Sequence, residues 1–199
     1  MHPPGGRRSV RGTFMGDWQL NALSVRQPRV DGRMKHSRAL LFISALVLCV
    51  GCDQATKLVA TACLEPASAF PLAADTVRFE LVHNPGAFMS LGANLPAALR
   101  EVLLLGLVPL GLLLASSLAL RSTSSRTLPL VAVGLIAGGG LSNWLDRLAH
   151  DGFVTDFLSV GIGPVRTGIF NVADLAVVAG LLLLAIAPRH LRKPDRRAA

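Results

Sequence analysis

The chain has 199 residues, of which 51% are apolar and 16% are charged, and its mean hydropathy is +0.50. These values exclude an ordinary soluble domain and favour a single membrane domain. The formal net charge of +8 would suit nucleic-acid binding, but 15 of the 20 Lys and Arg residues lie in the two terminal segments and one loop. That distribution is typical of membrane topology, so no nucleic-acid partner is expected.

Residues 1–38 are rich in Gly, Pro and Arg and have no sustained apolar period. This composition predicts a disordered basic tail. Met34, followed by Lys35, is an alternative start of translation.

The first apolar run extends from Ala39 to about Ala60, close to the roughly 20 residues that a helix needs to cross about 30 Å of hydrocarbon. A competing interpretation is a cleavable secretory or lipoprotein signal that ends at Cys52. Cys49 stands where such a signal usually has a branched apolar residue, and apolar residues resume at Leu58. A membrane helix is therefore favoured.

The segment from about 74 to 91 differs from its surroundings. Thr76 to Val82 alternate polar and apolar β-forming residues, which predicts a short strand, and Asn84-Pro85-Gly86 is a turn signal. We therefore expect a small β-sheet outside the membrane, at or near the lipid surface.

Three further apolar runs follow, at about 102–120, 128–145 and 170–187. Basic residues precede the first run, join the second to the third and follow the fourth, so the positive-inside rule places both termini in the cytoplasm. The predicted fold is an all-α integral membrane protein with four transmembrane helices and a small extracytoplasmic β-sheet. The predicted organisation is a cytoplasmic tail (1–38), a membrane domain (39–189) and a second basic cytoplasmic tail (190–199).

Polar residues inside the apolar runs converge at one depth. At about 1.5 Å per residue, Asp53 lies about 21 Å from the cytoplasmic start of its helix, and Asp174 about 20 Å from the cytoplasmic end of its own. Asn143 lies about 23 Å along the third run. Because charges inside a membrane are costly and usually functional, these helices are predicted to bring a functional polar layer to the outer third of the bilayer.

Two carboxylates of this region have counter-ions close in sequence. Lys57 follows Asp53 at i+4, and Arg147 directly follows Asp146. Both pairs are expected to support the architecture rather than to react.

Asp174 and Asp156, which lies in the outward segment 146–169, have no such neighbour. Two unpaired carboxyl groups brought together in a low-dielectric site share a proton, as in aspartic proteases. One then activates water as general base, while the other polarises the scissile carbonyl and protonates the amine. The spacing permits the two residues to meet, and it leaves open which of them is the initial base.

Five blocks of the chain resemble those of the bacterial lipoprotein signal peptidases (signal peptidase II). In chain order they are Asp53-Gln54-Ala55-Thr56-Lys57, Asn84-Pro85-Gly86-Ala87-Phe88, Gly138 through Asn143 to Asp146-Arg147, Val154-Thr155-Asp156-Phe157, and Phe170-Asn171-Val172-Ala173-Asp174. The resemblance covers about residues 38 to 190.

This resemblance implies a membrane aspartic endopeptidase of the bacterial inner membrane, with a β-sheet cradle and an active site toward the periplasm. Its substrates would be diacylglyceryl-modified prolipoproteins, cleaved on the amino side of the lipidated cysteine without metal, cofactor or covalent intermediate. The implied catalytic dyad is Asp156 and Asp174. Substrate binding or site support is implied for Asp53, Lys57, Asn84, Gly86, Asn143, Arg147, Asn171 and Ala173. We expect a monomer that contacts membrane lipid.

Alternatives remain for several of these residues. Asn143 and Asn171 could simply fasten helices together, and His83 with His150 could join carboxylates in a metal site. A single CxxC pair without a second half predicts no structural zinc site. For the whole protein the alternatives are a small proton-coupled carrier, which the apolar inner halves of the helices argue against, and a non-catalytic scaffold.

Overall fold

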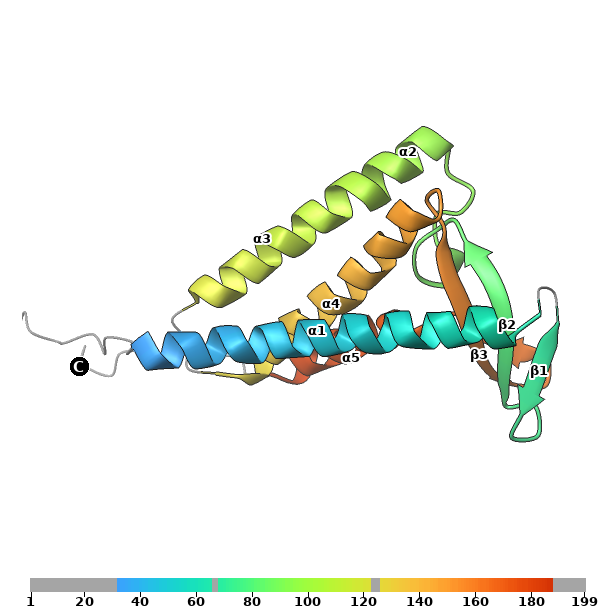
Figure 1. Cartoon of the computed structure of the whole chain (residues 1–199), viewed down its shortest axis with the longest axis horizontal. Coiled ribbons are helices and arrows are strands. Elements are labelled where there is room, and N and C mark those ends of the chain that lie inside the picture. The colour runs from blue at the N-terminus through green and yellow to red at the C-terminus, as the bar shows by residue number, and fades with distance from the viewer. Residues whose placement is uncertain (1–31, 66–67, 123–125, 188–199) are drawn as a thin grey trace, which may run out of the picture.

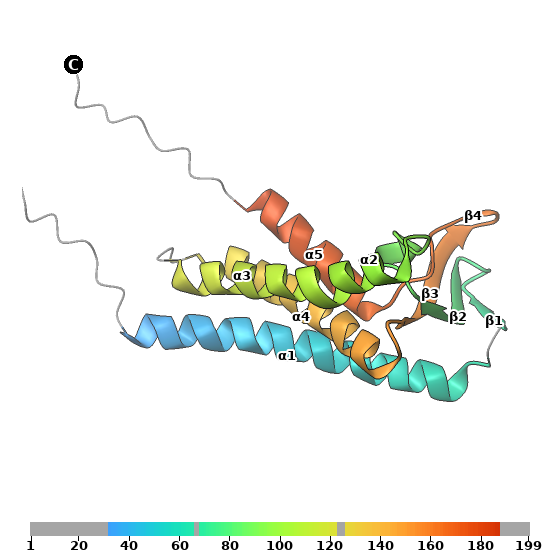
Figure 2. The ribbon, with the colours of Figure 1, turned by 90° about the horizontal axis from the view of Figure 1, so that it is seen from above.

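A computed structural model describes residues 32–65, 68–122 and 126–187. Helices run along the long axis of the molecule, and a small sheet stands across one end of them (Figure 1). The start of α1 and the end of α5 lie at the opposite end from the sheet, as Figure 2 shows from a second direction. The predicted tails fall outside the described residues, except for residues 32–38.

Helix α1 comprises Gly32–Cys63, and its stretch His36–Cys63 is long and apolar enough to cross a membrane. Residues 32–38 are therefore the first turns of α1 rather than part of the tail that their composition suggests. Lys and Arg are good helix formers, and here they directly precede the apolar run, so the helix extends back through them.

The next helical stretch is continuous and has three segments: α2 (Ala97–Glu101), a π-helical segment (Val102–Leu107) and α3 (Val108–Arg121). Pro109 has no N–H to donate to the carbonyl of Leu105, four residues earlier. The freed carbonyl accepts a hydrogen bond of 3.1 Å from the indole N–H of Trp144 on the neighbouring helix. The π-helical segment therefore lies where one helical hydrogen bond is lost. The hydrogen bond from Trp144 replaces it and joins this helix to α4.

Helix α4 (Leu128–Ala149) is central and packs against α1, α3 and α5. Its glycines allow close approach: a side chain at Gly138 would collide with the Leu46 backbone and Cys49 on α1, and one at Gly139 would overlap the Ala173 carbonyl oxygen on α5. Small residues serve in this way where membrane helices meet.

Helix α5 (Val172–Ile186) begins at a capping box, in which the Asn171 side chain accepts from the Asp174 N–H and the Asp174 carboxylate accepts from the Asn171 N–H. In the described part of the chain, three helices have the length and composition of membrane spans, and α5 is a shorter apolar helix. The structure is thus mostly helical, with three to four span-like helices and a small sheet.

The sheet is antiparallel with strand order β1-β2-β3-β4, made of Ala69–Leu72, Val77–Asn84, Val154–Ile162 and Val165–Arg166. Strand β2 confirms the strand predicted from Thr76 to Val82. Strand β3 was not predicted, because most of its residues are buried on both faces and the alternation of polar and apolar residues is lost. In the register, Val82 lies opposite Asp156 and Asn84 opposite Val154. Asp156 therefore stands on a strand and not in a loop.

Candidate active site

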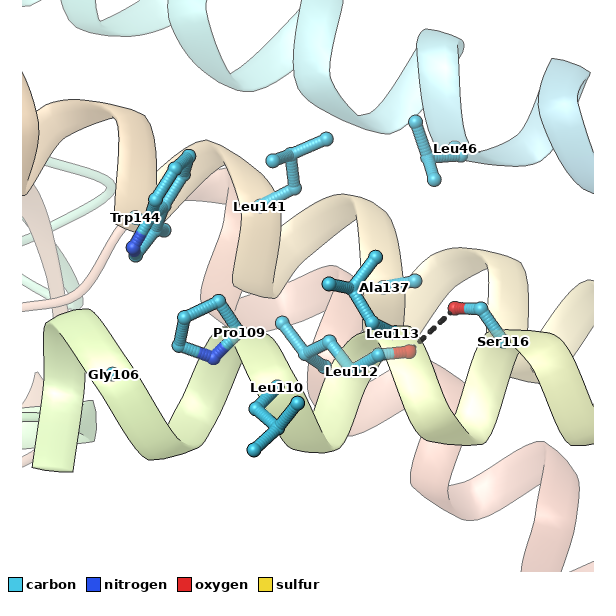
Figure 3. A pocket seen from close by; sticks show the side chains of 10 residues that line it. All are labelled: Leu46, Gly106, Pro109, Leu110, Leu112, Leu113, Ser116, Ala137, Leu141 and Trp144. Carbon is cyan, nitrogen blue, oxygen red and sulfur yellow. Dashed lines mark hydrogen bonds between the residues drawn. The ribbon is translucent and has the colours of Figure 1, made fainter.

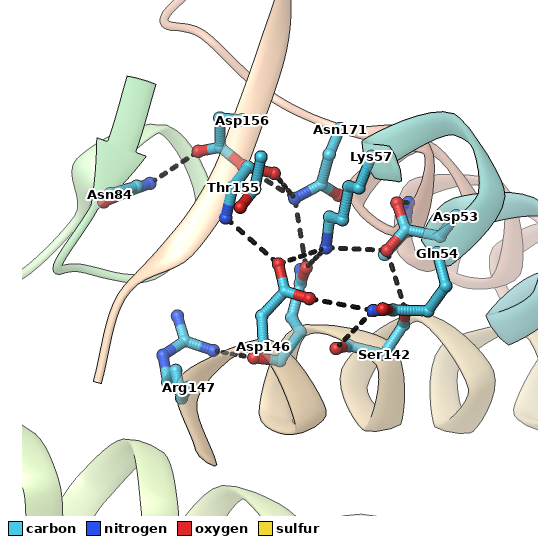
Figure 4. A network of polar contacts seen from close by, with 12 residues as sticks. Asp53, Gln54, Lys57, Asn84, Ser142, Asp146, Arg147, Thr155, Asp156 and Asn171 are labelled. Atoms are coloured by element: carbon cyan, nitrogen blue, oxygen red, sulfur yellow. Dashed lines mark hydrogen bonds and ion pairs between the residues drawn. The ribbon is translucent and has the colours of Figure 1, made fainter. Parts of the chain in front are cut away.

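A buried polar layer lies where the helices meet the sheet (Figure 4). It draws residues from five elements or their ends: α1, β2, β3, α4 and the start of α5. Its buried members are Asp53, Lys57, Asn84, Ser142, Asp146, Arg147, Thr155, Asp156, Asn171 and Asp174. Residues far apart in the sequence are thus brought together at the end of the helices that carries the sheet.

The Asp156 carboxyl group is 1% exposed and is held by two side-chain amides. Asn84 Nδ2 donates to Oδ2 at 2.9 Å, and Asn171 Nδ2 donates to Oδ1 at 2.6 Å. Burial raises the pKa of Asp156 from 3.8 to about 7; the charge of Asp174 adds to the rise, and the two amide donors oppose it. Asp156 can therefore hold or release a proton near neutral pH.

The Asp174 carboxylate occupies the first turn of α5. Asn143 Nδ2 donates to its Oδ1 at 3.0 Å, and the Asn171 backbone N–H donates to its Oδ2 at 3.4 Å. Asn171 thus contacts both Asp174 and Asp156. Within the described residues neither carboxylate forms an ion pair, as their sequence neighbours predict.

Lys57 is the cation at the centre of the layer. Its Nζ lies 2.7 Å from Asp53 Oδ2 and 2.9 Å from Asp146 Oδ2, and it donates to Asn143 Oδ1 at 2.9 Å. The pairing of Asp53 with Lys57 is as predicted. The predicted pairing of Asp146 with Arg147 is not observed. Consecutive residues of a helix point about 100° apart, and the Asp146 side chain faces Lys57 on α1.

Arg147 instead holds the turn after β2. Its Nη2 donates to the Gly86 carbonyl at 2.6 Å and its Nη1 to the Asn143 carbonyl at 3.1 Å. The turn is also closed by Asn84, whose Oδ1 accepts from the Gly86 N–H at 2.8 Å and whose Nδ2 donates to the Ala87 carbonyl at 3.1 Å. A side chain at Gly86 would overlap the backbone of Ser90 and Leu91, so this position requires glycine.

Three polar residues in the layer were not singled out from the sequence. Gln54 donates to Asp146 Oδ1 at 2.8 Å, and Ser142 donates to Asp53 Oδ2 at 2.7 Å. The backbone N–H of Thr155 donates to Asp146 Oδ2 at 3.0 Å. Ser142 is four residues before Asp146, and Gln54 is three residues before Lys57, so a helical projection of the polar residues could have found these two. The contact of Thr155 has no signal in the sequence, because it uses the backbone.

The metal alternative finds no support in the arrangement of the side chains. His83 and His150 are both exposed, and no group of three or more His, Cys, Asp or Glu side chains in the described ranges is placed to hold a metal ion.

An apolar cavity of about 500 Å³ lies between α3 and α4 (Figure 3). Trp144, adjacent in sequence to Asn143, stands at one end of it, and Leu46 of α1 and Ser116 of α3 at the other. A long apolar segment or a lipid chain could fill this space.

Comparison with known proteins gives consistent results. The family model described as Signal peptidase (SPase) II matches residues 45–188. The lipoprotein signal peptidase of Rhodococcus jostii (strain RHA1) is 36% identical over 163 residues, covering 79% of this chain and 76% of the relative. That of Moorella thermoacetica is 32% identical over 144 residues, covering 72% of this chain and 88% of the relative.

The fold is also similar to that of a solved bacterial membrane enzyme. The TM-score is 0.65 at 24% sequence identity, and the match covers 73% of this chain and 85% of that one.

Proposed function

Because this chain belongs to the signal peptidase II family of membrane aspartic peptidases, we propose that Asp156 and Asp174 are its catalytic dyad and that it cleaves prolipoproteins. The observation that carries this proposal is the buried arrangement around Asn171, which contacts both carboxyl groups while neither has an ion-pair partner among the described residues. A cation bound to either carboxyl group would favour two ionised groups, whereas the dyad needs one proton to share.

In the proposed reaction, one carboxylate removes a proton from a water molecule, which attacks the scissile carbonyl carbon. The protonated partner donates a hydrogen bond to the carbonyl oxygen and later supplies the proton that the leaving amine takes. A pKa of about 7 for Asp156 provides both protonation states near neutral pH. The amides of Asn84 and Asn171 orient the Asp156 carboxyl group, and Asn143 orients that of Asp174.

We propose that the substrate is a diacylglyceryl-modified prolipoprotein, cut on the amino side of the lipidated cysteine. The turn at Asn84 and Gly86, which Arg147 holds beside the layer, would accept the extended backbone around the cleavage site. The apolar cavity beside Trp144 would accept apolar parts of the substrate, because its lining is apolar and it lies between helices of membrane-span character.

The proposed topology has four transmembrane helices in the domain 39–189 and both termini in the cytoplasm of a monomeric inner-membrane protein. The sheet, and with it the dyad, would then face the periplasm. Exposed Cys63, at the outer end of α1, should react with a membrane-impermeant maleimide added from the periplasmic side, and protection from this reagent in intact spheroplasts would contradict the topology.

A proton-coupled carrier is less consistent with the structure. The buried polar and charged side chains of the described residues lie in the layer and the sheet, and none lies in the cytoplasmic halves of the helices. A carrier needs polar groups on both sides of a midplane site.

The test is cleavage of a lipid-modified precursor by purified protein, with Asp156→Asn and Asp174→Asn as variants. Each should lose at least about 10³-fold in kcat while it still accumulates in the membrane. Asp151→Asn is the matched control, since Asp151 is exposed and has a positive φ of 51°, which Asn tolerates. Wild-type cleavage by either dyad variant would refute the assignment.

A further inference from the structure

The residue before each proposed dyad aspartate donates its backbone N–H to a different buried carboxylate. Ala173, before Asp174, donates to Asp53 Oδ1 at 2.8 Å. Thr155, before Asp156, donates to Asp146 Oδ2 at 3.0 Å. Hydrogen bonds from N–H groups to ionised acceptors are stronger than neutral ones, so each carboxylate fixes the local backbone of one dyad residue.

One ammonium group joins these two carboxylates. Lys57 Nζ lies 2.7 Å from Asp53 and 2.9 Å from Asp146, and its remaining donor reaches Asn143 Oδ1 at 2.9 Å. The Lys57 and Asp53 side chains are 5% and 0% exposed, and that of Asp146 is 3% exposed. All three donors of the ammonium are therefore used, and the three charged groups form a closed unit away from water.

We propose that Asp53, Lys57 and Asp146 form a positioning bridge that sets the separation between Asp156 and Asp174. The inference rests on the dyad role proposed above. The two dyad residues stand on different elements, β3 and α5, with β4 and a loop between them in the chain. The bridge connects these elements through α1 and α4: from the Thr155 N–H to Asp146, through Lys57 to Asp53, and on to the Ala173 N–H.

The bridge acts through the dyad and touches no reacting atom. A misplacement of about 1 Å between reacting groups can cost on the order of 10²-fold in rate. Loss of the bridge should therefore lower kcat and leave substrate binding unchanged. A purely structural role predicts something different, namely that activity returns whenever stability returns.

Two variants separate these roles. Lys57→Met leaves two buried carboxylates without their cation, so both thermal stability and kcat should fall. The triple variant Asp53→Asn, Lys57→Met, Asp146→Asn removes all three charges but keeps a side-chain oxygen to accept each backbone N–H. It should recover much of the thermal stability, while its kcat, normalised to folded protein, stays about 10²-fold low at unchanged KM.

Asp75→Asn is the matched control. It also removes the charge of an aspartate that forms an ion pair, here with Arg78, but that pair is partly exposed on the sheet, and no hydrogen bond or ion pair of the described residues joins it to the bridge or the dyad. Its kcat should equal that of the wild type.

The proposal would be overturned by wild-type kcat in the triple variant, or by wild-type kcat in Lys57→Met. These failures differ from failure of the proposed function, because they would leave Asp156→Asn and Asp174→Asn inactive. Activity in those two variants would instead remove the dyad itself.

Discussion

Replacing Asp156 by Asn should change the pH dependence of protein stability as well as abolish cleavage. Burial raises the pKa of Asp156 in the folded state to about 7, from 3.8. The folded protein therefore holds a proton that the unfolded chain releases, so this group stabilises the fold fully below about pH 4. That stability is lost as the pH rises through about 7. The amide side chain of the variant does not ionise, so the variant lacks this loss.

The magnitude follows from the same two values. At about 1.36 kcal/mol per pH unit, the difference between 3.8 and about 7 corresponds to about 4 kcal/mol. A cost that does not vary with pH opposes this gain. In the wild type, both carboxyl oxygens of Asp156 accept a hydrogen bond, one from Asn84 and one from Asn171. An Asn side chain at position 156 has only one oxygen, and its NH₂ group cannot accept. One of the two donors therefore loses its partner, which should lower the stability by about 1–3 kcal/mol.

The assay is thermal unfolding of the purified wild type and Asp156→Asn in the same detergent at pH 5 and pH 8.5. The variant should be the less stable protein at pH 5. The wild type loses this stability between about pH 3.8 and about 7, so the part lost above pH 5 spans about 2 pH units, and the variant should gain about 3 kcal/mol relative to the wild type by pH 8.5. Asp151→Asn, on an exposed turn, should show no such change between the two pH values. A stability difference between Asp156→Asn and the wild type that is equal at both pH values would refute the reasoning.

Three further predictions concern packing, electrostatics and metal dependence. Gly139→Ala should destabilise the protein by about 1–3 kcal/mol and reduce cleavage, because the new methyl group overlaps the Ala173 carbonyl. Gly51→Ala is the control: open space surrounds Gly51, so thermal unfolding and activity should both stay unchanged. Asn84→Ala removes a hydrogen bond that lowers the pKa of Asp156, so the pH profile of kcat should move to higher pH; an unmoved profile would contradict the role of this amide. EDTA should leave the cleavage rate unchanged, and loss of activity that zinc restores would reopen the metal alternative.

Local patterns in the sequence predicted a large part of the structure. The apolar runs correspond to the helices, and the alternation from Thr76 to Val82 corresponds to β2. The pairing of Asp53 with Lys57 at i+4 depends only on helix geometry. Such features are fixed by neighbours in the chain, and so composition, spacing and helix length are enough to predict them.

The contacts between elements depend on the tertiary structure. Asp146 pairs with Lys57 across 89 positions and not with adjacent Arg147, because α4 turns that carboxylate toward α1. The first four residues of strand β3, Val154 to Phe157, are all buried, so the alternation of polar and apolar residues that would have predicted the strand is missing there. The sequence alone predicts a helical membrane protein with carboxyl groups at a common depth. This is possible because a membrane restricts both the length of a spanning helix and the polarity of its residues, and both can be read from the sequence. The packing of separate elements determines how Asn171 contacts both Asp156 and Asp174, because that contact requires a strand and a helix from distant parts of the chain to meet.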